Sequence, residues 1–161
     1  GNVASTGYVA VLLDPKPVVT EDDDGTYYEY SVSINGEDTT VTTKTTAVKD
    51  ALSAAGKGYV FFYNLEDGYV VDLNNETETG IVINRVQDVS AVTDDYVVID
   101  GKQYNIGDET VYTITKDYKK DGKTIDTVTV TAGGSYSKDN KVTFTTDDGD
   151  LDIVFIIEEI K

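Results

Sequence analysis

The chain has 161 residues and a formal net charge of −17, from thirty acidic and thirteen basic residues. This charge repels the phosphates of nucleic acids and anionic membrane surfaces, which excludes both as partners. Cysteine and histidine are absent, so disulfides, thiolate nucleophiles, zinc fingers and histidine-dependent triads are excluded as well.

Turn and strand residues dominate the composition. Val, Ile, Thr, Tyr and Phe supply 71 of the 161 residues, and all of them suit a pleated, half-buried surface. Asp or Asn directly precedes Gly six times, mostly between runs of these residues, which favours tight hairpin turns. The six pairs are Asp24-Gly25, Asn35-Gly36, Asp67-Gly68, Asp100-Gly101, Asp121-Gly122 and Asp148-Gly149. The sequence therefore predicts an all-β, antiparallel, hairpin-rich fold.

The first predicted strand spans 8–13 and ends before two prolines, and the acidic stretch 21–25 is predicted to be the loop that follows. The strand 27–34 shows the clearest alternation. Tyr28, Tyr30, Val32 and Ile34 are expected in the core, with Tyr27, Glu29, Ser31 and Ser33 on the other face. A polar strand over 39–43 follows the turn.

A short helix is predicted over 45–55, because Val48, Ala51, Leu52 and Ala55 have helical spacing and Gly56 can form a left-handed cap. Strands over 59–63 and 69–73 follow, joined at Asp67-Gly68. The polar segment 74–80 is the predicted linker between two β units, residues 1–79 and 80–161.

In the second unit the expected strands span 81–86, 96–99, 102–106, 111–115, 123–131, 141–146 and 151–158. The last is apolar on both faces, which is typical of a central strand. Segments 59–73 and 141–155 share a strand, acidic turn, strand pattern. This echo favours two related barrel- or sandwich-like units, with one continuous domain as the alternative.

Several of these segments also carry a family resemblance. They are VSINGEDTTVTT, GYVFFYNLEDGYVVDL, GIVINRVQDVS with DDYVVIDGKQYNIGDETVYTI, and KVTFTTDDGDLDIVFI. Their order resembles regions that follow or flank S-layer homology repeats in large surface proteins of Gram-positive bacteria, especially gut Clostridia. The resemblance covers roughly residues 8–158 and implies an extracellular, cell-wall-associated, structural or adhesive role. It transfers no catalytic residues, and the anchoring repeats are not in this sequence.

Two acidic turns raise a calcium hypothesis, with Asp22, Asp24, Asp147, Asp148 and Asp150 as candidate ligands. An EF-hand register through Gly25 puts Thr20 at the first ligand position and Ser31 at the twelfth, so that motif is absent, and solvated hairpin turns are the simpler interpretation. Three tyrosines, Tyr27, Tyr118 and Tyr136, are candidates for exposed rings that stack on a sugar.

These patterns predict a non-catalytic structural or interaction module of a surface protein, with no required cofactor. The alternatives are a carbohydrate- or calcium-binding module and, less favoured, a glycoside hydrolase that uses paired carboxylates. Expected partners are other domains of the same protein or cell-wall or host glycans. No segment reaches the length that spans a bilayer. Gly1 and the missing initiator methionine predict a fragment cut from a longer precursor.

Overall fold

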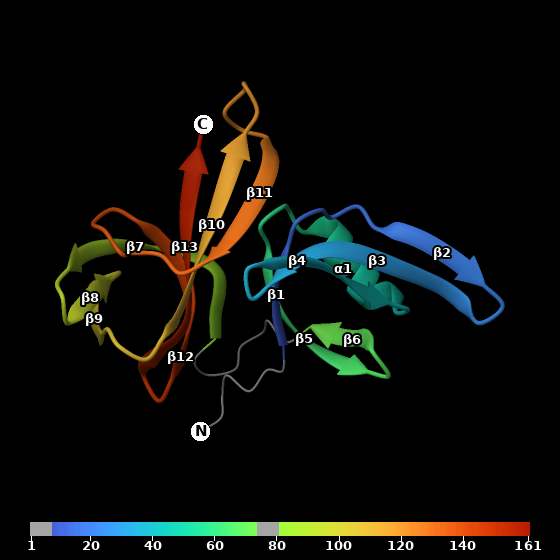
Figure 1. Cartoon of the computed structure of the whole chain (residues 1–161), viewed down its shortest axis with the longest axis horizontal. Helices are drawn as coiled ribbons and strands as arrows, with labels where there is room; N and C mark the ends of the chain where they lie inside the picture. The colour runs from blue at the N-terminus through green and yellow to red at the C-terminus, as the bar shows by residue number, and fades with distance from the viewer. Residues whose placement is uncertain (1–7, 74–80) are drawn as a thin grey trace. The chain divides into compact units, whose positions relative to one another are not determined.

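The computed structural model describes residues 8–73 and 81–161, and each range forms a compact unit (Figure 1). Strands make up most of both units, which confirms the predicted all-β class with a short helix. The predicted linker, residues 74–80, lies outside the described residues.

The N-terminal unit is a closed barrel. Its elements are β1 (Tyr8–Leu12), β2 (Val18–Asp22), β3 (Gly25–Ile34), β4 (Glu37–Thr43), α1 (Thr46–Ala54), β5 (Val60–Glu66) and β6 (Tyr69–Leu73). Strand β1 pairs with both β3 and β5, and the circuit closes through β3–β4, β4–β6 and β6–β5. Only the β4–β6 pairing in this circuit is parallel. Strand β2 pairs with β3 outside this circuit, so the barrel itself has five strands: β1, β3, β4, β5 and β6. A five-stranded Greek-key barrel of this order, with a helix between β4 and β5, has the architecture of the OB-fold.

Strand β2 was not predicted from the sequence. Its residues are exposed along its whole length, and its acidic end pairs Asp22 with Gly25. The turn therefore consists of Asp23 and Asp24, and Gly25 already belongs to β3. The sequence does not predict this strand because an exposed edge strand has no buried face, so its residues need not alternate between apolar and polar.

Alternation along β3 builds the barrel core as predicted. Tyr30 and Val32 are fully buried, whereas Glu29 and Ser31 are exposed. The core cluster consists of Ala10, Leu12, Tyr30, Val32, Val48, Leu52, Phe61, Tyr63 and Val70. Ser33 contradicts the expectation of an outward, exposed residue, because it is only 2% exposed. It pairs with Val11, which is buried on the same face, so the short serine side chain shares that buried position.

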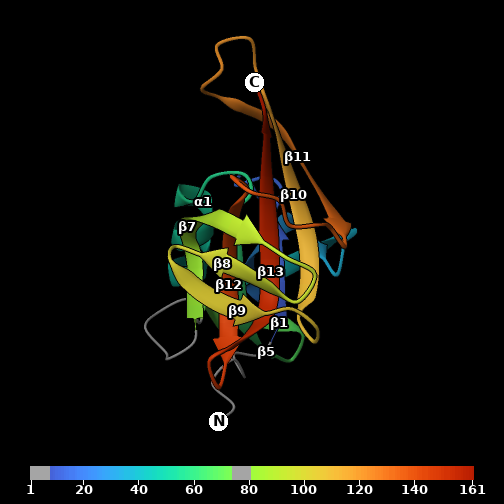
Figure 2. The same ribbon diagram turned by 90° about the vertical axis from the view of Figure 1, so that its left-hand side faces the viewer.

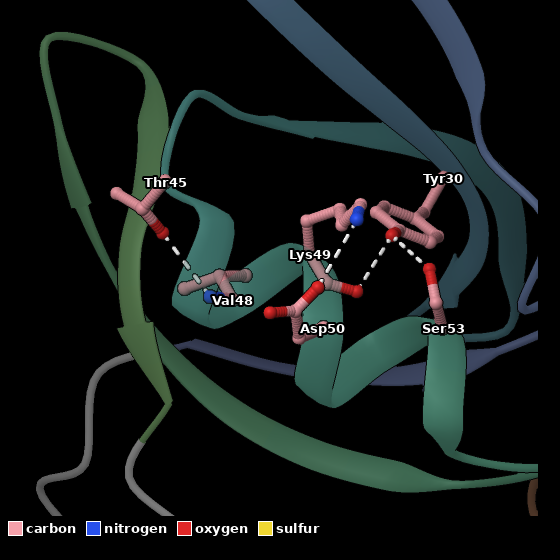
Figure 3. A network of polar contacts seen from close by, with 6 residues as sticks. All are labelled: Tyr30, Thr45, Val48, Lys49, Asp50 and Ser53. Atoms are coloured by element: carbon pink, nitrogen blue, oxygen red, sulfur yellow. Dashed lines mark hydrogen bonds and ion pairs between the residues drawn. The ribbon is translucent and has the colours of Figure 1, made fainter.

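Helix α1 closes the barrel through both apolar and polar contacts (Figure 3). Val48 and Leu52 enter the core, and the side chain of Thr45 accepts a hydrogen bond from the Val48 N–H at 3.2 Å, which caps the helix. The hydroxyl of Tyr30 lies 3.0 Å from the carbonyl of Lys49 and 2.7 Å from the Ser53 hydroxyl. These bonds attach the helix to β3.

The expected left-handed cap at Gly56 is wrong. The helix ends at Ala55, which is extended with φ −76° and ψ 157°, and its N–H reaches the carbonyls of Ala51 and Leu52. An extended residue ends the helix as effectively as a left-handed one here, because those carbonyls gain a donor. A positive φ appears later, at Gly58 (φ 92°).

The C-terminal unit repeats the strand circuit in a more open form. Its strands are β7 (Ile81–Val92), β8 (Tyr96–Ile99), β9 (Lys102–Asn105), β10 (Thr110–Tyr118), β11 (Ile125–Ala132), β12 (Lys141–Asp147) and β13 (Asp150–Ile160). Strand β7 pairs with both β8 and β12, as β1 does with β3 and β5. Strand β9 contacts β13 without a ladder pairing among the described residues. In chain order, the hairpin β10–β11 stands between β9 and β12, as α1 stands between β4 and β5 in the first unit. Strand β10 pairs in parallel with β13 (Figure 2).

Strand β13 is central, as its two apolar faces predicted, and lies between β10 and β12. Val154 and Ile156 join the core cluster, while Phe155 is buried on the opposite face and stacks on Tyr112 at 5.4 Å. Leu151 was expected on the face of Phe155 but belongs to the core cluster. A register shift against β12 places an extra residue before Val154, and this reverses the alternation.

Four of the six Asp-Gly or Asn-Gly pairs form two-residue hairpin turns with positive φ at both positions. They are Asn35-Gly36, Asp67-Gly68, Asp100-Gly101 and Asp148-Gly149. The pair Asp24-Gly25 is displaced by one residue, as described above. At Asp121-Gly122 the loop is longer, and the Asp121 carboxylate instead accepts the N–H groups of Lys123 and Thr124, both at 2.8 Å.

Candidate functional site

An aromatic–lysine surface, defined here as Tyr27, Lys44 and Tyr69, lies on the N-terminal barrel. Strand pairing explains why these three residues meet. Thr43, the last residue of β4, pairs with Tyr28 of β3 on one side and with Val70 of β6 on the other. The Thr43 hydroxyl also donates to the Val70 carbonyl at 2.7 Å, which fixes the parallel pair. Residues adjacent to this junction are therefore neighbours in space.

The two rings and the ammonium group are in direct contact. The ring centroids of Tyr27 and Tyr69 are 5.8 Å apart and their planes are inclined by 30°. Lys44 Nζ lies 4.1 Å from the Tyr69 centroid and 5.3 Å from that of Tyr27. Both distances are within cation–π range. Both tyrosines are half-buried, so each residue retains part of its solvent-accessible surface.

Carboxylates flank the aromatic–lysine surface on two turns. Asp22 and Asp24 lie at the tip of the β2–β3 hairpin, and Glu66 and Asp67 lie at the tip of the β5–β6 hairpin. All four side chains are exposed. Partial desolvation, followed by the negative charge of Asp22, raises the pKa of the Tyr27 phenol. The surface thus combines apolar rings, a single ammonium group and several hydrogen-bond acceptors.

A hollow of about 240 Å³ opens beside the ring of Tyr69. It is lined by Lys44, Thr45, Glu66, Asp67, Tyr69, Val70 and Val71. The hollow has the size of a small-ligand subsite and borders apolar, cationic and anionic groups together. This arrangement suits recognition of a ligand better than proton transfer, because the flanking carboxylates are solvated.

The predicted calcium ligands fall on two separate turns. Asp22 and Asp24 lie at the tip of the β2–β3 hairpin, whereas Asp147, Asp148 and Asp150 lie at the tip of the β12–β13 hairpin of the other unit. The Asp22 carboxylate accepts the N–H of Asp24 at 2.8 Å, which is a turn interaction. Within residues 8–73 and 81–161, no group of three or more Asp or Glu side chains is arranged to hold a metal ion. Calcium binding stays a hypothesis.

The other two candidate tyrosines are engaged within the C-terminal unit. Tyr118 donates its hydroxyl to Glu159, which raises the pKa of the phenol to about 12 and lowers that of the carboxyl group. Tyr136 packs beside the core cluster and donates to Glu109 at 2.8 Å. Burial, reinforced by this bond, raises the pKa of Tyr136. Both hydroxyl groups are therefore engaged in hydrogen bonds within the unit.

Sequence analysis identified Tyr27 but missed Lys44 and Tyr69. Lys44 follows a polar strand, and Tyr69 follows an Asp-Gly turn, so each has an ordinary setting when considered alone. Their proximity depends on the parallel β4–β6 pairing, which joins segments on either side of helix α1. Hydrophobic alternation does not predict such a pairing.

Comparison of the sequence with models of known protein families and with curated proteins finds no match. The likeness to bacterial surface proteins therefore rests on the segments quoted above.

Among the residues that the structure describes, no helix has both the length and the apolar character needed to cross a membrane.

Proposed function

We propose that this protein is a non-catalytic interaction module of a bacterial cell-surface protein, and that the aromatic–lysine surface is its binding surface. The observation that carries this proposal is the convergence of Tyr27, Lys44 and Tyr69 at one junction of the barrel. Two half-buried aromatic rings, one of which lines a hollow, provide contact area for a ligand. This contact requires no catalytic group.

The position of this surface on the barrel supports the same function. OB-type barrels bind oligonucleotides and oligosaccharides on the face of their second and third strands, between two flanking turns. The corresponding elements here are β3 and β4 with the β2–β3 and β5–β6 turns. The argument is one of fold-level analogy, so it concerns the location of the site and not the identity of its ligand.

The cell-surface setting follows from the resemblance to regions beside S-layer homology repeats. Partners in that setting are other domains of the same protein and cell-wall or host glycans. The strongly acidic chain makes nucleic acid an unfavourable partner even for an OB-type barrel, because the phosphate backbone dominates such binding.

The test is co-sedimentation of the purified chain with cell walls from a Gram-positive, clostridial species. We expect the protein to sediment with the walls and the Tyr69→Ala variant to remain largely in the supernatant. The matched control is Tyr8→Ala, because Tyr8 is also an exposed ring of the same barrel and stacks on Tyr63 at 5.6 Å.

The same incubation tests the non-catalytic part of the proposal. We expect no increase in reducing ends in the supernatant. Protein that stays unbound at every wall concentration would contradict the interaction role, and time-dependent release of sugar would identify an enzyme.

A further inference from the structure

We infer that the aromatic–lysine surface binds a neutral saccharide, with sugar rings lying against Tyr27 and Tyr69. This inference rests on the proposed function and specifies its ligand class. It follows from the chemistry of the groups that border the two rings, considered one at a time.

The rings require a ligand with an apolar face. Tyr27 and Tyr69 are inclined by 30° with centroids 5.8 Å apart, and the hollow lies beside Tyr69. The C–H face of a pyranose ring packs on the face of an aromatic ring, while its hydroxyl groups point outward around the rim. A tyrosine provides this contact at low cost in conformational entropy.

The rim of the hollow matches those hydroxyl groups. Lys44 is a hydrogen-bond donor, and the carboxylates of Glu66 and Asp67 are acceptors on the same rim. Thr45 adds a hydroxyl group, which also accepts the cap bond of helix α1. A sugar hydroxyl both donates and accepts, so it satisfies either kind of partner.

The charge of the N-terminal unit disfavours anionic ligands. Residues 8–73 contain twelve acidic residues and four lysines, so phosphates, uronates and other anions are repelled. The same net charge attracts cations, and Lys44, with its ammonium group 4.1 and 5.3 Å from the two ring centroids, opposes a cation only locally. A neutral polyhydroxyl compound avoids the repulsion, and a cationic ligand is the competing class in the test.

The experiment is calorimetric titration of the full chain with soluble neutral oligosaccharides, namely gluco-, manno- and N-acetylglucosamine series. Oligogalacturonate is the anionic comparison and oligolysine the cationic one. We expect saturable binding of at least one neutral series and none of the two charged ligands. Removing either ring, by Tyr27→Ala or Tyr69→Ala, is expected to weaken binding about tenfold, as for loss of an aromatic contact.

Two further variants separate loss of the ring from loss of the fold. Tyr69→Phe keeps the ring, and its affinity for the neutral oligosaccharide is expected to be within about twofold of that of the unchanged protein. The same is expected of Tyr8→Ala, because Tyr8 is not part of the aromatic–lysine surface. Lys44→Gln is expected to weaken neutral saccharides without creating affinity for oligogalacturonate.

Three results overturn the inference: no neutral series binds, oligolysine binds more tightly than every saccharide, or Tyr8→Ala loses as much affinity as Tyr69→Ala. If the chain sediments with cell walls through Tyr69 yet binds no neutral saccharide, the interaction role stands and the ligand class is wrong. If it neither sediments nor binds saccharides, both proposals fail.

Discussion

The two units use one strand circuit with different insertions. In the N-terminal unit the first strand, β1, pairs with β3 and β5, and in the C-terminal unit the first strand, β7, pairs with β8 and β12; in each, a tight acidic turn joins the last two strands. The N-terminal unit places helix α1 between β4 and β5 and closes through the β4–β6 pairing. The C-terminal unit places the β10–β11 hairpin there, and β10 extends the sheet beside β13.

The difference between the insertions explains where the candidate site lies. Closure of the first barrel brings Lys44, at the end of β4, beside Tyr69, at the start of β6. In the second unit the corresponding strands, β9 and β13, are in contact without a ladder in the described residues. Its candidate tyrosines instead donate to Glu159 and Glu109. The units with different insertions thus also differ in their tyrosines: Tyr27 and Tyr69 meet at the barrel junction, whereas Tyr118 and Tyr136 donate to carboxylates.

The largest expected effect comes from opening the closed barrel at Tyr30. The ring is fully buried and its hydroxyl group contacts Lys49 and Ser53 of helix α1. Tyr30→Ala is expected to reduce the free energy of unfolding by about 3–5 kcal/mol, as other buried aromatic truncations do. Urea melts measure this loss.

The neighbouring Ser31→Ala is the control for Tyr30, because Ser31 is exposed on the opposite face of β3. Its expected cost is below about 0.5 kcal/mol, as at ordinary surface sites. Comparable losses for the two variants, or a larger loss at Ser31, would contradict the register of β3 on which the barrel depends.

A smaller loss is expected in the C-terminal unit from Gly134→Ala. Gly134 has φ +149°, and an added Cβ would clash with Thr113 Oγ1, which donates to the Gly133 carbonyl. Backbone strain and the displaced hydroxyl are expected to cost roughly 1–3 kcal/mol.

Gly107→Ala is the matched control, since Gly107 lies in the same unit with open space around its Cα and no positive φ. Thermal melts of both variants measure the difference. A Gly134→Ala protein as stable as Gly107→Ala would show that this segment does not pack against β10 as described.

The bond between Tyr118 and Glu159 predicts a pH-dependent contribution to the stability of the C-terminal unit. The folded-state pKa of Tyr118, about 12, exceeds the ordinary value of 10.0 for a tyrosine, so the protonated phenol is favoured on folding. This stability is fully present below pH 10 and is lost as the pH rises to about 12.

Melting curves of the unchanged protein and Tyr118→Phe, recorded from neutral to high pH, isolate this contribution. The advantage of the unchanged protein is expected to be constant up to about pH 10 and to shrink above it. A constant difference across the whole range would show that the phenol does not hold its proton through Glu159.

The smallest expected effect is common to the two units. Residues 8–73 have twelve acidic and four basic residues, and residues 81–161 have sixteen and nine. Like charges within each unit therefore repel one another and destabilise its folded state. Raising NaCl from about 0.01 M to about 0.15 M shortens the Debye length from about 30 Å to about 8 Å and should raise the thermal midpoint by a few degrees. A flat or falling midpoint would mean that local ion pairs outweigh the general repulsion.

The sequence predicted local structure well wherever a turn and an alternating strand adjoin. Asn35-Gly36 and Asp67-Gly68 turn as expected, and Tyr30 and Val32 lie in the core. Strand β2 was not predicted because its five residues are all exposed and show no alternation of buried and exposed positions. The echo between 59–73 and 141–155 marks the last two strands of each circuit. The hairpins upstream of these two segments differ, because Asn35-Gly36 joins β3 to β4 whereas Asp121-Gly122 lies in the inserted β10–β11 hairpin.

The candidate site was predictable only in part. Exposure of Tyr27 follows from alternation along β3, but the partners of Tyr27 come from the ends of β4 and β6. A parallel pair across a helix is a long-range contact and leaves no local pattern. For Tyr118 and Tyr136, no local pattern indicates that carboxylates forty-one and twenty-seven residues away accept hydrogen bonds from their hydroxyl groups.

The central claim, that binding belongs to the closed barrel and not to the open unit, is tested most directly by mapping a bound ligand on the labelled chain. Amide shifts would be recorded while soluble cell-wall glycan fragments are added. We predict that the perturbed amides cluster around Tyr27, Lys44 and Tyr69, with the β10–β11 hairpin unchanged. Perturbations centred on Tyr118 or Tyr136, with the barrel junction unaffected, would contradict the account.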